Sequence, residues 1–455
     1  MIQMKISEIQ EACGGKLQGN PDTWIEEITI DSRKAKKGCL FAAIKGERTD
    51  GHSYIAAAAR QGAAAVLCEK VPENAEIPYI LTESTLKALQ DIAAYMLKKA
   101  ALIKVGIGGS VGKTSTKEAV ASVLEQKFSV LKTQGNFNNG LGVPLTIFNL
   151  KKENNAAVIE MGIDDFGQMH ELASIVRPNI CLLTNIGDCH LENLGDREGV
   201  LKAKSEMFDF LEEKDRIVLN GDDAHLKRLC SLKKGKPLFF GLDSKNDVWA
   251  DEIESFGLKG SSCCIHCKLG SEKVFVPKPG IFMVYNALAA TAVGMLMGLT
   301  LDEIKRGIES QESVSGRFNI IQKNDLCIID DCYNANPMSM KSSLESLSQA
   351  DGRRVAVLGD MGELGENEEE LHRQVGRFAA EDKADLICCI GTLGRFIAEE
   401  AKRGKGQVLC FETVEEFEKE IPSLIQKKDT ILVKASHFMA FDRIVKTLGE
   451  TVLDK

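Results

Sequence analysis

The sequence predicts an α/β protein of three domains built around parallel sheets. Its 455 residues correspond to about three domains at roughly 150 residues each. Short apolar runs alternate with helical patterns, which is typical of parallel sheets covered by helices on both faces. This alternation begins near residue 102 and restarts after residue 316. We therefore place the domains at residues 1–100, 101–313 and 314–455.

The first domain is expected to be a small α/β unit. Its apolar and alanine-rich runs are bounded by glycine and charged residues, which mark turns. The expected elements, in order, are a strand at 25–30, a turn at 36–38, a returning strand at 39–44, a helix at 53–61, a strand at 64–68 and a helix at 85–100.

The second and third domains are each expected to hold a parallel sheet. Strands buried on both faces appear as continuous apolar runs, and in the second domain these are residues 103–107, 156–159, 180–183 and 217–219. Residues 236–277 are instead typical of several short strands. The third domain should be Rossmann-like, with five strands at 326–329, 355–358, 386–390, 408–411 and 430–433.

Composition predicts a soluble protein. The chain is 44% hydrophobic and 27% charged, and its net charge of −9 gives no long-range attraction to nucleic acid or anionic lipid. Residues 280–299 carry no charge and are long enough to span a membrane. However, polar and glycine residues interrupt them, and the site motifs require both halves of the chain together. We expect a buried helix here and no membrane span.

The compartment predicted is the reducing cytoplasm. The N-terminal segment lacks the apolar stretch of a secretory signal, and the fourteen cysteines are too scattered for a disulfide framework. A cluster of Cys263, Cys264 and Cys267 around His266 lacks a second ligand pair at zinc-finger spacing. Its alternation favours a strand over a zinc site.

The strongest functional signal is a glycine-rich loop, GSVGKTS at residues 109–115. It follows a predicted strand and opens a helical pattern, the context that a phosphate-binding loop requires. Backbone N–H groups at a helix N-terminus bind phosphates, Lys113 adds a positive charge, and Thr114 can bind Mg²⁺. The spacing departs from the standard loop, since Ile107 stands five residues before Gly112. The alternative is a glycine turn followed by a chance Lys-Thr pair.

Three further residues are candidates for chemistry. Glu160 closes one predicted strand and His190 follows the next, so both should lie at the same edge of the sheet as the loop. Lys204 falls on an apolar helical face. Either its ammonium extends to water, or the lysine is buried with a lowered pKa and reacts as a neutral amine.

These motifs resemble the Mur ligases, ATP-dependent amide-forming enzymes of peptidoglycan precursor synthesis. GSVGKTS is similar to their ATP loop and TNIGDCHLE (184–192) to their histidine segment. AKSEMF (203–208) is similar to the segment whose lysine the family carbamylates. The other matching segments are YNALAA (285–290), which contacts adenine in the family, and SGRF (315–318), which opens the third domain.

Within this family, three segments resemble the member that joins D-alanyl-D-alanine to UDP-N-acetylmuramoyl-tripeptide. These segments lie at residues 133–146, 330–339 and 357–365. Residues 31–55 are similar to a UDP-sugar-binding domain, whereas the Asp-Asn-Pro-Arg signature of the diamino-acid-adding relative is absent. The implied reaction passes through an acyl phosphate. The alternatives are a Mur-type or folylpolyglutamate-type ligase adding one amino acid, a GTPase-like switch, and a non-catalytic nucleotide-binding module.

The resemblance also implies cofactors, partners and roles for individual residues. We expect a monomer that uses ATP and two Mg²⁺ ions, with Thr114 and Glu160 holding the first ion, and His190 and carbamylated Lys204 the second. The implied catalytic residues are Lys113, Glu160, His190 and Lys204. The implied ATP-binding residues are Gly109, Ser110, Val111, Gly112, Lys113, Thr114, Ser115, Asn286, Arg317 and Asp331. The implied substrate-binding residues are Ser32, Arg33, Lys45, Gly46, Asp50, His52, Asn136, Asn138, Asn139, Tyr333, Asn334 and Asn336.

Three positions depart from the family pattern. Phe282 and Met283 stand where the family usually has His-Asn, ahead of the expected adenine contact Asn286. His437 stands where an arginine is usual, and an imidazole cannot provide the permanent charge and two-pronged hydrogen bonding of a guanidinium.

Overall fold

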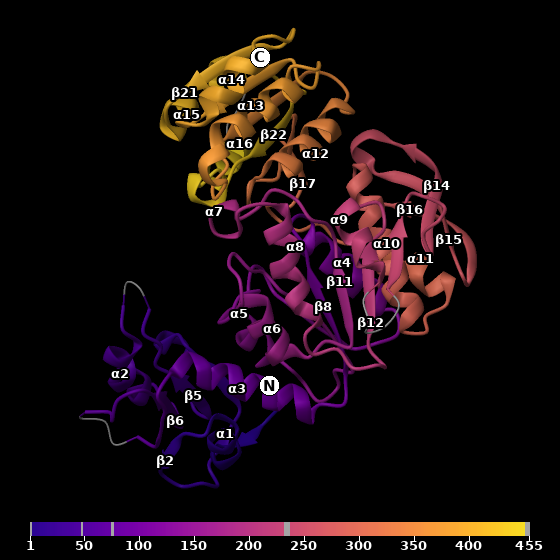
Figure 1. Ribbon diagram of the computed structural model, residues 1–455. Coiled ribbons are helices and arrows are strands. Elements are labelled where there is room, and N and C mark those ends of the chain that lie inside the picture. Colours follow the sequence, from indigo (N-terminus) through magenta and orange to yellow (C-terminus); the bar gives the residue numbers. More distant parts are fainter. Residues whose placement is uncertain (1, 47–48, 74–76, 232–236, 451–455) are drawn as a thin grey trace.

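The computed structural model describes residues 2–46, 49–73, 77–231 and 237–450. Figure 1 shows three α/β parts in chain order: an N-terminal part in indigo, a central part, and a C-terminal part in orange and yellow. The described strands form sheets of two, five, nine and six strands. This confirms the predicted α/β fold class with parallel sheets. The exact boundaries at residues 100 and 313 stay predictions.

In the first domain, a five-stranded sheet has the order β2-β7-β6-β5-β4, and β1 pairs with β3. The strands are β1 (Met4–Lys5), β2 (Lys16–Gln18), β3 (Trp24–Ile25), β4 (Glu27–Thr29), β5 (Cys39–Ala42), β6 (Ala65–Cys68) and β7 (Tyr79–Leu81). The helices are α1 (Ile6–Cys13), α2 (Ile55–Arg60) and α3 (Thr85–Lys99).

The single strand predicted at residues 25–30 is wrong. Residues Trp24–Ile25 pair with β1, whereas Glu27–Thr29 pair with β5, so the chain changes sheets between them. The strand at residues 39–44 was expected to return antiparallel to the strand before it. This is also wrong, because β4 and β5 are parallel. A short 3₁₀ turn, Ser32–Lys34, lies between these strands, and the Asp31 carboxylate caps it by accepting a hydrogen bond from the Arg33 N–H.

The central sheet has nine strands in the order β16-β15-β14-β13-β12-β11-β8-β10-β9. Its strands are β8 (Ile103–Gly108), β9 (Val130–Lys132), β10 (Ala156–Glu160), β11 (Ile180–Leu183), β12 (Arg216–Asn220), β13 (Leu238–Gly241), β14 (Val248–Ser255), β15 (Ser261–Cys267) and β16 (Gly270–Val276). The short strands predicted after residue 236 therefore extend the main sheet, and β15 and β16 pair antiparallel.

The order of this sheet reverses at β8. The chain runs from β8 to β9 and β10 on one side, and then crosses to β11 and β12 on the other. In open α/β sheets, ligands bind beyond the carboxyl ends of the strands at such a reversal. The loop at residues 109–112, between β8 and α4 (Lys113–Leu124), lies at this position.

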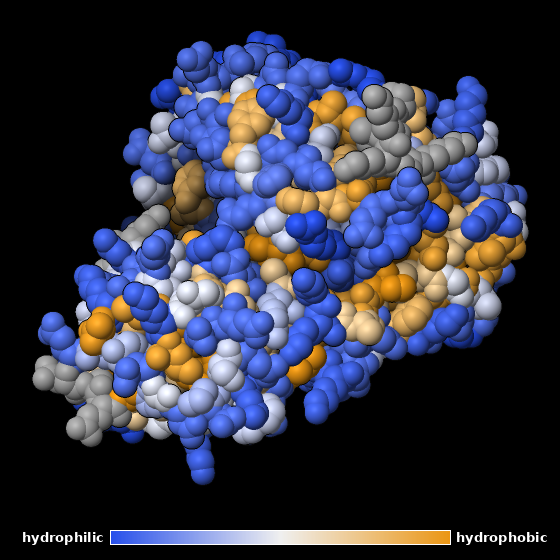
Figure 2. Space-filling view, turned by 60° about the horizontal axis from the view of Figure 1, so that its bottom comes forward, coloured by the Kyte–Doolittle hydropathy of each residue, from blue (hydrophilic) through white to orange (hydrophobic). Residues whose placement is uncertain are grey.

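The uncharged segment near residue 290 forms a buried helix, as predicted. This helix, α10 (Ile281–Leu296), packs against α4, and Val284, Leu288 and Val293 are fully buried. Among the helices of the described residues, none is both long enough and apolar enough to cross a membrane. On the face drawn in Figure 2, hydrophilic side chains surround separate hydrophobic patches.

Substitution at Gly307 should destabilise the central domain. Gly307 lies on α11 (Leu301–Glu309), where a Cβ would overlap the backbone of Val123 on α4. We expect Gly307→Ala to lower the free energy of unfolding by about 1–3 kcal/mol, because the two helices must separate. Urea unfolding followed by circular dichroism measures this. Gly394→Ala is the control, since its Cβ would make only ordinary contacts; equal stability of both variants would contradict the prediction.

The hydrophobic core continues from the first domain into the second through α3. Leu89 and Ile92 on this helix belong to the same buried cluster as Ile147 and Leu172 of the central domain. These two residues lie on α5 (Gly142–Ile147) and α6 (Gln168–Val176). The first domain thus packs against α5 and α6 of the central domain through a shared apolar interface.

The third domain holds a six-stranded sheet in the order β17-β18-β22-β19-β20-β21. Its strands are β17 (Asn319–Lys323), β18 (Leu326–Asp330), β19 (Arg354–Gly359), β20 (Leu386–Ile390), β21 (Gln407–Phe411) and β22 (Thr430–Lys434). Its helices are α12 (Pro337–Ser348), α13 (Glu368–Ala379), α14 (Gly394–Ala401), α15 (Val414–Leu424) and α16 (Asp442–Glu450). The five predicted strands are confirmed; the sixth, β17, is an antiparallel edge strand.

Candidate functional site

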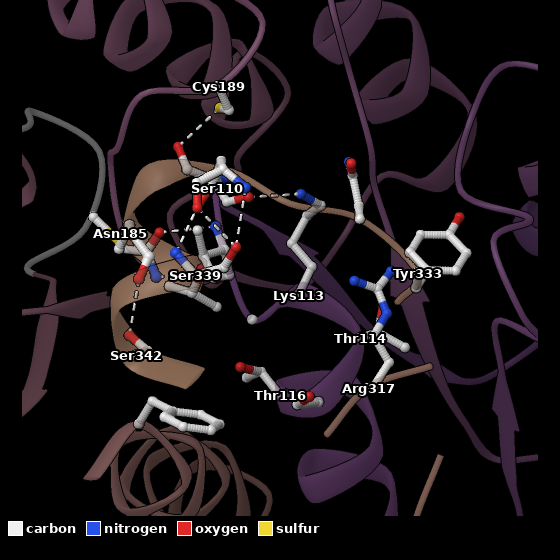
Figure 3. Close-up of a pocket in the computed structure, with 18 of the residues that line it drawn as sticks. Ser110, Lys113, Thr114, Thr116, Asn185, Cys189, Arg317, Tyr333, Ser339 and Ser342 are labelled. Atoms are coloured by element: carbon white, nitrogen blue, oxygen red, sulfur yellow. Dashed lines mark hydrogen bonds between the residues drawn. The ribbon is translucent and has the colours of Figure 1, made fainter. Parts of the chain in front are cut away.

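A cavity of about 730 Å³ lies between the central and third domains, at the reversal in the central sheet. The central domain contributes the start of α4 and the ends of β10 and β11, and the third domain contributes residues 331–343 and 362–364. Polar and charged residues line it from both sides, and Figure 3 shows many of them. The cavity brings together 16 of the 25 predicted site residues: Ser110, Val111, Gly112, Lys113, Thr114, Ser115, Asn138, Asn139, Glu160, His190, Asn286, Arg317, Asp331, Tyr333, Asn334 and Asn336.

The predicted residues that do not line the cavity are Gly109, Lys204, Asn136, Ser32, Arg33, Lys45, Gly46, Asp50 and His52.

The glycine-rich loop has the geometry of a phosphate-binding loop. Gly109 has a φ of 140°, and a Cβ there would overlap the Thr184 hydroxyl, so glycine is required. Lys113 is the first residue of α4, and its Nζ donates to the carbonyls of Gly109 at 2.8 Å and Ser110 at 3.3 Å. The lysine thus curls back over the loop (Figure 3). Burial lowers its pKa.

The loop is held by the segment after β11, which the sequence did not identify as a support. The Asn185 side chain accepts a hydrogen bond from the Val111 N–H at 2.9 Å and donates to the Val111 carbonyl at 3.0 Å. The Ser110 hydroxyl accepts from the Gly187 N–H at 2.9 Å. The one available signal was the position of these residues beside His190, in the segment 184–192. Their contacts orient the backbone N–H groups of the loop.

Glu160 has the surroundings of a metal ligand. Its side chain is 1% exposed at the end of β10. Oε1 accepts hydrogen bonds from the Thr114 hydroxyl at 3.2 Å and from the Asn138 amide at 2.8 Å. Oε2 is buried and has no hydrogen-bond partner among the described residues. A buried carboxylate oxygen without a partner is costly, and Mg²⁺ prefers such oxygen ligands. The residues present therefore fit a magnesium ion.

Lys204 is buried, which excludes the alternative that its ammonium extends to water. The residue is 1% exposed on α8 (Arg197–Ser205). Burial lowers its pKa to about 8, and the nearby charge of Lys113 adds to this effect. The α-helix ends at Ser205, and residues Glu206–Phe208 continue it as a 3₁₀ turn. A larger fraction of Lys204 is thus the neutral amine near neutral pH than for an exposed lysine.

His190 lies at the boundary with the third domain. It adopts a left-handed conformation, with φ of 52°, immediately before α7 (Leu191–Leu194). Its Nδ1 lies 2.6 Å from Oε2 of Glu363, a third-domain residue that the sequence did not single out. The interaction lowers the pKa of the Glu363 carboxyl group. Both residues line the cavity.

The third-domain wall combines an aromatic stack with a buried ion pair. The Arg317 guanidinium lies 3.7 Å from the centre of the Tyr333 ring (Figure 3). Asp331 lies 2.6 Å from Nζ of Lys434, which is 2% exposed and which the sequence did not assign to the site. His437 packs with its ring 5.5 Å from that of Tyr333 and does not line the cavity.

At the other end of the cavity, Asn286 is held by α4. Its Oδ1 accepts a hydrogen bond from the Thr116 hydroxyl at 2.8 Å. Phe282 and Met283, the two residues that differ from the family's usual His-Asn, also line the cavity. Tyr285 donates to Asp222 at 2.8 Å, and both residues line the cavity although the sequence did not predict them as site residues.

The residues expected to bind the UDP-sugar lie in the first domain, apart from this cavity. Arg33 makes two hydrogen bonds to the Asp31 carboxylate, each 2.9 Å long. His52 lies 2.6 Å from Asp50 through Nδ1 and accepts the Glu69 N–H through Nε2 at 2.9 Å. Lys45 and Asp50 form an isolated β-bridge. The structure does not bring these residues to the cavity, and their binding roles stay predictions, as does that of exposed Asn136.

The chain matches three domain families along its length. The Mur ligase family catalytic domain matches residues 25–96, the Mur ligase middle domain matches residues 107–294, and the Mur ligase glutamate ligase domain matches residues 316–437. The chain therefore belongs to the Mur ligase family and is an ATP-dependent ligase.

Full-length relatives give a more specific comparison. The UDP-N-acetylmuramoyl-tripeptide–D-alanyl-D-alanine ligase of Bacillus subtilis (strain 168) is 35% identical, with 100% of each chain covered. The crystal structure of MurF from Acinetobacter baumannii has a TM-score of 0.91 at 34% identity, covering 99% of each chain. MurF from Thermotoga maritima in complex with ADP has a TM-score of 0.83 at 29% identity, covering 94% of this chain and 97% of that one.

Proposed function

We propose that this chain joins D-alanyl-D-alanine to the terminal carboxylate of UDP-N-acetylmuramoyl-tripeptide, giving the pentapeptide, ADP and phosphate. Similarity to the Bacillus subtilis ligase over the full length of both chains supports this substrate pair. The structural observation that carries the proposal is the cavity between two domains, with the Lys113 loop on one wall and Arg317 and Tyr333 on the other. The product is a precursor of peptidoglycan.

The proposed chemistry explains why the cavity is polar and shared by two domains. A carboxylate is a poor electrophile, so the γ-phosphoryl group of ATP is first transferred to it, and the amine of D-alanyl-D-alanine then displaces phosphate from the acyl phosphate. Lys113 lies where its charge would stabilise the transferring phosphoryl group. Because water would hydrolyse the acyl phosphate, a site that closes between two domains protects it.

Two magnesium ions belong to this proposal. Thr114 and Glu160 would hold the first, and His190 with carbamylated Lys204 the second. When bound, such ions supply positive charge that offsets the repulsion between the carboxylate and the phosphoryl group. A carbamate forms from a neutral amine, and the lowered pKa of Lys204 favours that form. We further propose that the enzyme acts as a monomer in the cytoplasm.

An acceptor assay tests the proposal. We expect phosphate release and pentapeptide formation with UDP-N-acetylmuramoyl-tripeptide, ATP and D-alanyl-D-alanine. With the UDP-muramoyl dipeptide, neither L-lysine nor meso-diaminopimelate should be ligated. Mass spectrometry of the products measures both reactions, and omission of ATP is the control. Efficient ligation of a single diamino acid would instead assign the chain to the related ligases that add one amino acid.

A further inference from the structure

The third domain touches the predicted metal-binding edge of the central domain at Glu363. Besides the 2.6 Å approach of its carboxylate to His190, its backbone carbonyl accepts a hydrogen bond from the Leu191 N–H at 3.0 Å. Gly365 of the third domain also packs closely against this segment, because a Cβ there would lie 3.4 Å from the backbone nitrogen of Glu192. Leu191 and Glu192 are the first two residues of α7. Figure 1 shows α7 next to the third domain. Side-chain and backbone contacts thus join the two domains here.

The backbone on both sides of this contact is conformationally unusual. His190 has a φ of 52° and Glu363 a φ of 62°. Residues other than glycine rarely adopt this left-handed conformation, and it persists where surrounding contacts hold it. The contact between the two domains therefore coincides with an unusual backbone conformation on each side, at His190 and at Glu363.

The contact is better suited to orienting His190 than to stabilising the fold. The Glu363 side chain is 57% exposed, and exposed ion pairs contribute little to stability. An imidazole has two ring nitrogens, and a carboxylate at Nδ1 leaves Nε2 available to bind an ion. Carboxylates placed behind metal-binding histidines fix the orientation of the ring in this manner.

We infer that Glu363 is a positioning residue that completes the second magnesium site only when the third domain closes on the central domain. The inference rests on the proposed function, because it takes His190 as a ligand of the second ion. Glu363 and His190 belong to different domains, so the carboxylate orients the ring only in the closed arrangement. Binding of the second ion and domain closure therefore favour each other.

Manganese titration tests this inference without relying on turnover. Mn²⁺ binding is followed by electron paramagnetic resonance in the presence of a non-hydrolysable ATP analogue. We expect Glu363→Ala to weaken the second Mn²⁺ about 10–100-fold and to leave the first unchanged. Glu363→Gln retains a side-chain oxygen that can approach Nδ1 and should keep most of the affinity. Glu366→Ala removes an exposed carboxylate of the same loop and is the matched control.

The outcomes separate this inference from the proposed function. Unchanged affinity for the second Mn²⁺ in Glu363→Ala would overturn the inference, as would an equal loss in the Gln and Ala variants. A lowered urea midpoint that accounts for the weaker binding in Glu363→Ala would also overturn it. Failure of the wild-type protein to ligate D-alanyl-D-alanine would overturn the proposed function, and it is measured separately by product analysis.

Discussion

Lys113→Ala should lower turnover on the order of 10³-fold or more while leaving the fold intact. Its ammonium lies over the phosphate-binding loop, held by the carbonyls of Gly109 and Ser110. In the reaction it would stabilise the charge that develops on the transferring phosphoryl group, and removal of such groups costs several orders of magnitude. Steady-state phosphate release with both substrates measures the effect.

Two variants control this experiment. Lys151→Ala removes an exposed lysine distant in sequence from the loop and should leave turnover unchanged. Lys113→Arg keeps the charge but not the compact ammonium, so it should recover little of the activity. A folded Lys113→Ala protein that retains a tenth of wild-type turnover would contradict the assignment of this loop as the catalytic ATP site.

Lys204→Ala should lower turnover about 10²–10³-fold at the chemical step, with ATP still bound through the loop. A carbamate on this buried lysine would supply oxygen ligands that alanine lacks. Added acetate or propionate should therefore restore part of the activity. Single-turnover formation of the acyl phosphate measures the chemical step, and calorimetry with an ATP analogue measures nucleotide binding.

Lys202→Ala is the matched control for Lys204, since it lies two residues earlier on the same helix and is exposed. It should keep full activity. Labelling with ¹³C-bicarbonate should give a carbamate signal in the wild-type protein and in Lys202→Ala, but not in Lys204→Ala. Undiminished turnover of Lys204→Ala, or absence of the label from active wild-type protein, would contradict carbamylation.

The elements that the sequence predicted well are those determined by local pattern. Buried parallel strands such as β10 and β11 are continuous apolar runs, and the phosphate loop combines a strand, glycines and a helix within a short segment. The edge strand β17 escaped prediction because Asn319–Lys323 are only partly buried and lack such a run. The division of residues 24–29 between two sheets depends on partners that are distant in sequence.

The site shows the same division between local and distant effects. Lys113, Glu160 and His190 could be predicted because each lies at or shortly after the carboxyl end of a strand of the same sheet. Glu363 and Lys434 could not, because their roles arise from residues on other elements: His190 for the first and Asp331 for the second. The burial of Lys204 was one of two alternatives, and the packing around α8 decides between them.

The packing of α10 against α4 has a consequence for synthesis on the ribosome. Val120 and Val123 on α4, and Val105 and Val158 on the strands, share a buried cluster with Leu288 and Val293 on α10. The ribosome makes α10 roughly 160 residues after α4, which takes about 8–30 s at typical elongation rates. During that interval one face of the nascent sheet lacks its covering helix. We therefore expect nascent chains of this enzyme to pass through a stage in which exposed apolar surface favours aggregation.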